Sequence, residues 1–224
     1  MPDIANRLVL VAGATSTSGL TCARALTAAG ARVVAVGRDA GKLDALAAEV
    51  PGISVRACDL TDESAVQDLA QQVHDSDGRV DGIVHLVGGW RGGGGLAGQS
   101  DEDYRFLERS FTALRHVSRA FDSDLRASPA GRLAIVSSTS VTRPLAGGAN
   151  YAAVKAASEA WTRAVAQGFG KSARDAGAEL SAAAVIFRVK TLAGLEDALA
   201  ARVVGLWDAD AASLNDTVVT LGDD

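Results

Sequence analysis

The chain of 224 residues is poor in the residue types from which metal centres and disulfide frameworks are built. It has two cysteines, Cys22 and Cys58, and three histidines that lie far apart in the sequence. Neither set has the spacing of a metal-binding motif or of a disulfide framework, so we expect buried thiols and no metal site.

Long apolar runs are also missing. No segment approaches the roughly 18 apolar residues that a membrane span needs. The N-terminus, Met1-Pro2-Asp3, lacks the basic region and the apolar region of a signal peptide. The sequence therefore predicts a cytoplasmic protein that does not insert into a membrane.

Positive charge is scarce as well. The net charge is −5 and the arginines are scattered, so a nucleic-acid-binding surface is not expected. Hydrophobic residues make up 48% of the chain, which is enough to bury the core of one domain of this length.

What the chain does have is an alternation of short β-branched runs and longer alanine-rich stretches. Strands are expected at 8–12, 32–36, 54–57, 82–87, 133–137, 180–186 and 217–221. Helices are expected at 19–29, 42–50, 63–74, 101–126, 151–175 and 195–206. Several strands are apolar on both faces, as in Ile83-Val84-His85-Leu86-Val87. This pattern predicts a single α/β domain over 1–224, a Rossmann-type doubly wound parallel sheet of about seven strands with helices on both faces. Residues 1–130 would form its cofactor half and residues 131–224 its catalytic and substrate half.

A loop of small residues joins the first expected strand to the first helix. It contains Gly13, Thr15, Ser16, Thr17, Ser18 and Gly19. Small residues let the backbone approach a pyrophosphate, and the helix N-terminus offers free N–H groups to it. An ordinary tight turn between a strand and a helix is the alternative.

The second strand ends at Gly37-Arg38-Asp39. An acid at that tip would bind the ribose hydroxyls of NAD, whereas a guanidinium can hold a 2′-phosphate. Arg38 therefore favours NADP(H), and NAD(H) is the less expected cofactor. Asp39 could still bind a ribose if the strand ends later.

The third strand ends at Cys58-Asp59-Leu60. The Asp59 carboxylate, at a carboxyl tip, is placed to accept a hydrogen bond from an adenine amino group. Alternatively Asp59 caps the next helix, although Thr61 is the better candidate for that cap.

Tyr151 and Lys155 are separated by one helical turn and share a helix face. A cation close to the phenol would lower its pKa and suit it to exchange a proton with a substrate oxygen. Ser138 ends a strand thirteen positions earlier, where its hydroxyl could bind that oxygen. A surface pair on a helix is the alternative.

These residues, in this order and at these spacings, resemble the short-chain dehydrogenases/reductases over almost the whole chain. The resemblance implies that Ser138 orients a carbonyl, Tyr151 is the acid/base, and Lys155 binds the nicotinamide ribose and depresses the pKa of the tyrosine. It also implies cofactor contacts from Leu60, Val87, Gly88, Gly89 and Thr191.

The chain departs from that family in four places. Thr17 stands where the glycine loop usually has a middle glycine. His85-Leu86-Val87-Gly88 replaces the usual Asn-Asn-Ala-Gly motif. Ser110 stands where a helix asparagine would hold a proton-relay water, and Ile186-Phe187 replaces the usual Pro-Gly. The chain is also short between Thr191 and Leu195, so the usual helical substrate lid is not expected.

A glycine-rich loop, Gly88-Gly89-Trp90-Arg91-Gly92-Gly93, follows the fourth strand. It resembles the corresponding loop of dihydropteridine reductases, short family members on which a flat pterin could stack on Trp90. Those enzymes prefer NADH, which argues against a close match. Trp90, Arg91 and Phe187 are the expected substrate contacts, and Arg143 and Arg188 are further candidates to line the pocket.

Two functions follow from these patterns. The first is an NADP(H)-dependent oxidoreductase acting on a small carbonyl, alcohol or imine. The second is a non-catalytic NADP-binding sensor or assembly protein on the same fold, which would have no need of the acid/base pair. The resemblance also implies that the helices 101–126 and 151–175 pair between subunits, so a homodimer or homotetramer is expected. Small residues such as Ala156, Ala157, Ala160 and Ala164 would allow that close packing, although they equally suit burial within one subunit.

Overall fold

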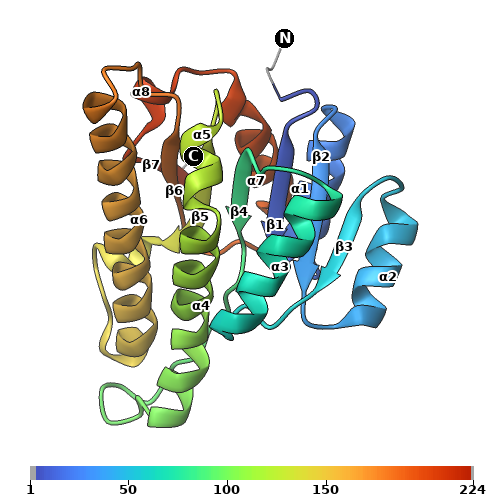
Figure 1. The fold of residues 1–224 in the computed structure, drawn as a ribbon. Helices are drawn as coiled ribbons and strands as arrows, with labels where there is room; N and C mark the ends of the chain where they lie inside the picture. The colour runs from blue at the N-terminus through green and yellow to red at the C-terminus, as the bar shows by residue number, and fades with distance from the viewer. Residues whose placement is uncertain (1–3, 223–224) are drawn as a thin grey trace.

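The computed structural model describes residues 4–222, and its centre is one parallel sheet of seven strands (Figure 1). The strand order is β3-β2-β1-β4-β5-β6-β7. The strands are β1 (Leu8–Ala12), β2 (Arg32–Gly37), β3 (Ser54–Ala57), β4 (Gly82–His85), β5 (Arg132–Ser138), β6 (Ala183–Val189) and β7 (Thr217–Leu221). The order reverses between β1 and β4, as in a doubly wound sheet, so the predicted fold class is confirmed.

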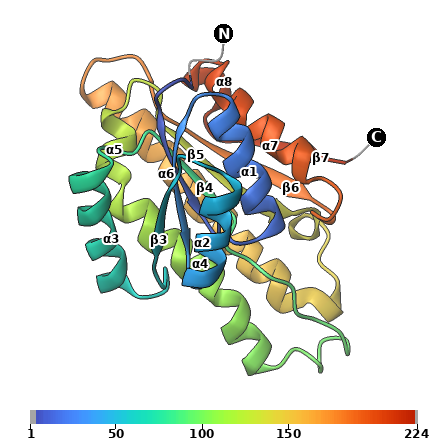
Figure 2. The ribbon, with the colours of Figure 1, turned by 90° about the vertical axis from the view of Figure 1, so that its right-hand side faces the viewer.

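Helices cover both faces of this sheet (Figure 2). They are α1 (Thr17–Ala28), α2 (Ala40–Glu49), α3 (Glu63–Ser76), α4 (Asp101–Ala120), α5 (Asp122–Ala127), α6 (Ala149–Asp175), α7 (Glu196–Val204) and α8 (Ala211–Leu214). Three short 3₁₀ turns, η1 (Thr139–Val141), η2 (Ala146–Gly148) and η3 (Gly205–Trp207), complete the described elements.

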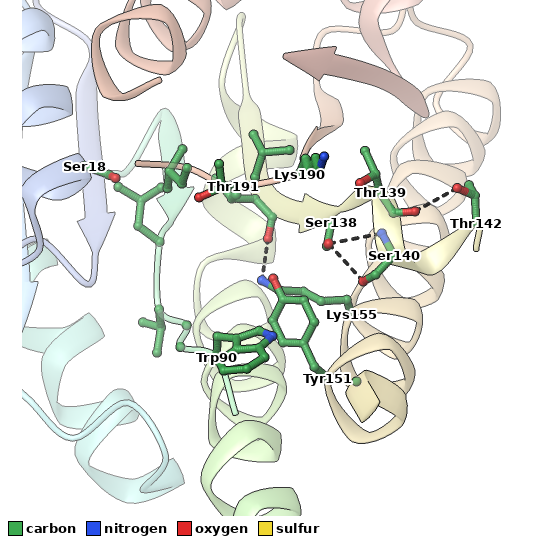
Figure 3. Close-up of a pocket in the computed structure, with 18 of the residues that line it drawn as sticks. Ser18, Trp90, Ser138, Thr139, Ser140, Thr142, Tyr151, Lys155, Lys190 and Thr191 are labelled. Atoms are coloured by element: carbon green, nitrogen blue, oxygen red, sulfur yellow. Dashed lines mark hydrogen bonds between the residues drawn. The ribbon is translucent and has the colours of Figure 1, made fainter. Parts of the chain in front are cut away.

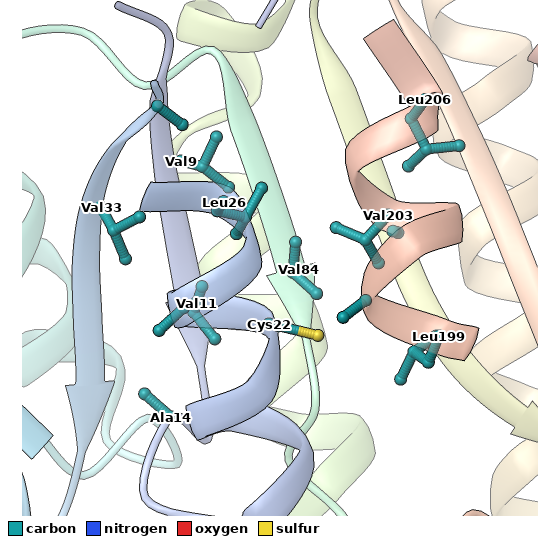
Figure 4. Packing of buried hydrophobic residues seen from close by; sticks show 14 of the residues in the cluster. Val9, Val11, Ala14, Cys22, Leu26, Val33, Val84, Leu199, Val203 and Leu206 are labelled. Carbon is teal, nitrogen blue, oxygen red and sulfur yellow. The ribbon is translucent and has the colours of Figure 1, made fainter. Parts of the chain in front are cut away.

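Two apolar clusters hold the layers together. One packs α1, α2 and α7 against one face of the sheet, with Cys22 and Leu26 of α1 beside Val203 of α7 (Figure 4). The other packs α3, α4, α5 and α6 against the opposite face. Both cysteines are buried and free, as expected.

The expected helix 101–126 is two helices. Phe121 has non-helical backbone angles and a fully buried side chain at the junction. The predicted cap of α3 was also wrong, because Asp62 and not Thr61 accepts the first backbone N–H groups. Ser100 caps α4 by accepting from the N–H of Asp103.

Strand β6 lies three residues later than predicted. The apolar Leu180 predicted an earlier start. In the structure the Arg132 guanidinium donates a hydrogen bond to the Ser181 carbonyl at 3.0 Å, and the pairing with β5 begins at Ala183. This shift places Phe187 inside the strand, where its side chain is 1% exposed. The prediction that Phe187 lines a substrate site was therefore wrong.

Candidate active site

Two adjoining cavities lie at the carboxyl edge of the sheet, where the strand order reverses. Their volumes are about 1060 and 310 Å³. Ser16 and the backbone of residues 86–89 line both of them, so they form one groove along β1 and β4. Open α/β sheets bind dinucleotides at this position.

The glycine loop forms the floor between the two cavities. Gly13 has φ +85°, and a Cβ there would lie 2.9 Å from the backbone of Leu86 and Val87. Ser16 caps α1 by accepting from the N–H of Gly19 at 3.1 Å. A tight turn of small residues next to a helix N-terminus lets a phosphate group approach the backbone, so the loop fits a pyrophosphate.

Most of the predicted cofactor residues line this groove. The exceptions in the glycine loop are Thr17 and Gly19, which line neither cavity. Thr17 is exposed in the first turn of α1, and a Cβ on Gly19 would lie 2.5 Å from the carbonyl oxygen of Ala14. Gly19 therefore allows the first turn of α1 to lie close against the loop at Ala14. The groove-lining residues among the predictions are Gly13, Thr15, Ser16, Ser18, Gly37, Arg38, Asp59, Leu60, Val87, Gly88, Gly89, Tyr151, Lys155 and Thr191.

The smaller cavity holds the charged tips of β2 and β3. Arg38 is exposed and lines it, whereas Asp39 caps α2 by accepting from the N–H of Lys42 at 3.0 Å. Asp59 accepts from the hydroxyl of Thr61 at 2.7 Å and from Arg109 at 3.1 Å. The pKa of Asp59 is lowered, mainly by the Thr61 hydroxyl and further by the two arginines. Asp39 is thus engaged in its own helix, and the cation Arg38 faces the cavity.

The larger cavity contains Ser138, Tyr151 and Lys155 together (Figure 3). The Ser138 Oγ accepts from the hydroxyl of Ser140 at 2.9 Å and from its N–H at 3.2 Å. A serine oxygen has two lone pairs. Since Ser140 uses both, Ser138 can act toward the groups in the cavity only by donating its hydroxyl hydrogen.

Tyr151 lies in the first turn of α6 and is partly buried. Burial raises the pKa of its phenol, and a hydrogen bond with the Ser138 side chain opposes the rise. In the protein alone the net direction is upward, and the expected depression of this pKa by Lys155 stays a prediction. At neutral pH the phenol therefore carries its proton.

Lys155 follows one turn later on α6, with its Nζ 5.8 Å from the centroid of the Tyr151 ring. The Nζ donates to the Val136 carbonyl of β5 at 2.8 Å. Burial lowers the pKa of Lys155 to about 8, and the negative charge of Glu159 works against this shift. The ammonium is held at the cavity wall by strand and helix together.

Glu159 was missed in the sequence, although it continues the spacing of Tyr151 and Lys155 along the same face of α6. Its carboxylate accepts from Ser137 at 2.7 Å and from Arg188 of β6 at 2.6 Å. Burial raises the pKa of Glu159, but the bonds from Arg188 and Ser137 outweigh it and the pKa is lowered. A fixed negative charge thus lies one turn beyond Lys155.

His85, at the end of β4, is a second residue whose importance the spacing did not reveal. Its Nε2 lies 3.1 Å from the carbonyl oxygen of Ser110. Because a carbonyl only accepts, Nε2 carries the hydrogen and Nδ1 is a bare acceptor. That Nδ1 is buried and has no partner among the described residues. Burial lowers the pKa of His85 to about 4, aided by the charge of Lys155.

Gln99 ties the glycine-rich loop to the catalytic helix. Its side-chain amide donates to the carbonyls of Gly93 at 3.1 Å and Gly147 at 3.0 Å. Its Oε1 accepts from the N–H of Asn150, the residue before Tyr151, at 3.1 Å. The loop that carries Trp90 is therefore fastened to the start of α6.

Two further predicted site residues lie differently from expectation. The hydroxyl of Ser110 donates to the Leu107 carbonyl of its own helix at 2.8 Å, and the residue borders the smaller cavity. The carbonyl of Ser110 is directed to His85 and its hydroxyl hydrogen is used within its own helix, so a role of this side chain in a proton relay stays a prediction. Arg91 lies over the Phe106 ring at 3.9 Å and lines neither cavity.

Trp90, by contrast, lines the larger cavity and is 62% exposed. The same cavity is lined by residues that the sequence did not single out, namely Thr139, Ser140, Thr142, Leu145, Lys190 and Leu192. Within residues 4–222, no group of three or more metal-ligating side chains comes together. No helix in that range is both long and apolar enough to cross a membrane.

A profile described as short chain dehydrogenase matches residues 7–173 of the chain. The chain belongs to this family. The bovine (Bos taurus) protein named dehydrogenase/reductase SDR family member 7B is 30% identical over 168 residues, which cover 70% of this chain. The chain spans about half (52%) of that relative's length. The 3-oxoacyl-(acyl-carrier-protein) reductase of Salmonella typhimurium is 27% identical over 165 residues, 72% of this chain and 66% of the relative.

Solved structures of short chain dehydrogenases share the fold along the whole chain. One from Shigella flexneri, complexed with NADP, has a TM-score of 0.85 at 20% identity and covers 98% of this chain and 99% of its own. A metagenomic short-chain oxidoreductase in complex with NADP has a TM-score of 0.83 at 26% identity and covers 99% of both chains. An NAD⁺-bound xylitol dehydrogenase reaches 0.83 at 17% identity, covering 98% of both.

Proposed function

We propose that this chain is an oxidoreductase that uses NADP(H) to interconvert a carbonyl compound and its alcohol, or an imine and its amine, with Tyr151 as acid/base. One observation carries the proposal. Ser138, Tyr151 and Lys155 line the same cavity, which continues into the glycine-loop groove that fits a dinucleotide.

The groove suggests which residues would hold NADP(H). The backbone around Gly13 and Ser16 would receive the pyrophosphate, and Arg38 the 2′-phosphate. Lys155 and Thr191, in the larger cavity, would meet the nicotinamide riboside. The engagement of Asp39 as a helix cap supports NADP(H) over NAD(H), whereas the related structures hold either NADP or NAD⁺.

Bound there, the nicotinamide would exchange a hydride with the substrate carbon. Ser138 would donate its hydroxyl hydrogen to the substrate oxygen and hold it beside the phenol. Tyr151, protonated at neutral pH, would give its proton to that oxygen in reduction and take it back in oxidation. The Lys155 ammonium would stabilise the phenolate that remains.

Substrate-side contacts come from the glycine-rich loop and from the segment between β5 and α6. Trp90 offers a flat, exposed ring at the cavity, so a planar substrate such as a pterin is compatible with it. The resemblance of this loop to that of dihydropteridine reductases is the support for that class.

The experiment is a comparison of the wild-type protein with Tyr151→Phe on a panel of aldehydes, ketones and imines with NADPH. Turnover should fall by about a thousandfold while NADPH binding stays within a few-fold. Tight NADPH binding by the wild type with no turnover on any compound would instead favour a sensor or assembly protein.

A further inference from the structure

Among the described residues, the charged side chains that line the larger cavity are all positive, although the chain as a whole is acidic. Its charged lining residues are Arg143, Lys155 and Lys190, and its lining within residues 4–222 contains no aspartate or glutamate. The chain as a whole has more acidic residues (27) than lysines and arginines (22). A cationic cavity in an acidic protein attracts anions and disfavours cations.

Two of these cations are free to meet a ligand. Lys155 is buried and bound to the Val136 carbonyl. Arg143 and Lys190 are exposed, and in the described part of the chain neither side chain has a hydrogen-bond or ion-pair partner. An unpaired arginine presents a planar fork of donors that matches a carboxylate.

The two cations belong to different sides of the site. Lys190 precedes Thr191 directly after β6, close to where the cofactor is proposed to lie, so it could serve the cofactor phosphates. Arg143 lies in the segment between η1 and η2, which connects Ser138 to Tyr151. Arg143 is therefore on the substrate side, apart from the glycine loop.

Apolar surface accompanies Arg143. Leu145, two residues on, is 72% exposed, and Trp90 is 62% exposed, and both line the same cavity. A ligand that suits this lining has a negative group at one end and a flat or apolar body.

We infer that the substrate is an oxo acid, a carbonyl compound with a carboxylate that pairs with Arg143 and an apolar body that contacts Trp90 and Leu145. This rests on the proposed function, because it places the reacting carbonyl at Ser138 and Tyr151. Reduction would then convert the oxo acid to a hydroxy acid, with the hydride from NADPH on carbon and the Tyr151 proton on oxygen.

The test uses two aldehydes that differ in one charge, 4-carboxybenzaldehyde and its methyl ester, each with NADPH. The measured quantity is the ratio of kcat/KM for acid over ester in wild type, Arg143→Gln and Arg202→Gln. Arg202 is an exposed arginine on α7 that lines neither cavity, so its variant is the matched control. Dividing the variant ratio by the wild-type ratio removes the intrinsic reactivity of the two aldehydes.

The ratio should fall about tenfold to a hundredfold in Arg143→Gln and stay within twofold in Arg202→Gln, as expected for the loss of a charge-assisted hydrogen bond. An unchanged ratio in Arg143→Gln overturns the inference and leaves the proposed reductase intact.

A binding measurement decides the matter if neither aldehyde is turned over. Calorimetry on the NADP⁺-loaded protein would compare 4-carbamoylbenzoate with its neutral counterpart terephthalamide. The carboxylate should bind at least about tenfold more tightly to wild type, with that advantage lost in Arg143→Gln. Equal binding of the two compounds, or an advantage kept in the variant, contradicts the inference, whereas a failure of the proposed function shows as absent turnover on all carbonyls.

Discussion

Ser140 donates both its hydroxyl and its backbone N–H to the Oγ of Ser138, at 2.9 and 3.2 Å. These two bonds leave Ser138 only its hydroxyl hydrogen to donate, and they fix the direction in which that hydrogen points. Both residues lie at the carboxyl end of β5, in the cavity that holds Tyr151.

Replacement of Ser140 by alanine should therefore lower kcat/KM by about fivefold to tenfold, because one of the two bonds that direct the Ser138 hydrogen is lost. Ser138→Ala should lower it by about a hundredfold or more. Steady-state kinetics on one carbonyl substrate would measure both, with Ser213→Ala, an exposed serine on α8, as the control. A Ser140→Ala variant as active as that control would show that the Ser138 direction does not matter.

Lys155 should limit activity at alkaline pH. Its pKa of about 8 means that the ammonium is charged below pH 8 and loses its proton as the pH rises through that value. The phenolate then loses its stabilising neighbour, so kcat/KM for reduction should fall above about pH 8.

The variant Glu159→Gln tests whether Lys155 causes this alkaline fall in activity. The negative charge of Glu159 raises the pKa of Lys155, so Glu159→Gln should move the alkaline fall to lower pH. Since the change also removes the bond to Arg188, thermal unfolding of the variant would be recorded alongside. A midpoint that stays in place or moves to higher pH in a folded variant contradicts this assignment.

Arg38 should determine the choice between the two nicotinamide cofactors. Arg38→Ala is expected to weaken NADPH binding by about tenfold to a hundredfold and to leave NADH binding within about threefold, because only NADPH has the 2′-phosphate. Fluorescence titration of both reduced cofactors with wild type and variant would measure this. An equal loss for NADPH and NADH would mean that Arg38 contacts a group common to both.

His85 should make the protein less stable in mild acid. In the unfolded chain its pKa is near the ordinary 6.5, whereas burial lowers it to about 4 in the folded state. The unfolded state then binds the proton more readily, so stability is full above pH 6.5 and is lost as the pH falls toward 4, by up to about 3 kcal/mol.

The comparison is with His85→Asn, which has no titrating group at this position. Chemical denaturation at several pH values should show a steeper loss of unfolding free energy between pH 6.5 and 4 for wild type than for His85→Asn. Parallel curves for the two proteins would show that His85 does not carry this pH dependence.

The bounds of a strand could be predicted from the sequence where polar residues, glycine or proline flank a short apolar run. β1, β3 and β7 have the predicted bounds, because glycine, proline or polar residues interrupt the apolar run. The run before β6 had no such end: its pairing with β5 begins at Ala183, and the Ser181 carbonyl before it accepts a hydrogen bond from Arg132. Because the strand starts later than the apolar run, Phe187 lies in the core and not at the expected substrate site.

The candidate site was predictable where its residues lie on one helix or at the ends of neighbouring strands. Tyr151 and Lys155 lie on one helix, and their shared cavity with Ser138 follows from parallel strands ending at one edge. The sequence did not predict the contacts of Arg91, Glu159 and His85. Their partners, Phe106, Arg188 and Ser110, belong to other elements or turns, and only the folded chain shows which of them are in reach.

The most direct test of the central claim is the turnover of Tyr151→Phe with NADPH on a carbonyl that the wild type reduces, together with the NADPH dissociation constant of both proteins. The phenol oxygen is the one atom removed, and it lies in the cavity beside Ser138. We predict a loss of about a thousandfold in kcat with NADPH binding changed by less than about threefold. A variant that retains wild-type turnover would contradict the assignment of Tyr151 as the acid/base.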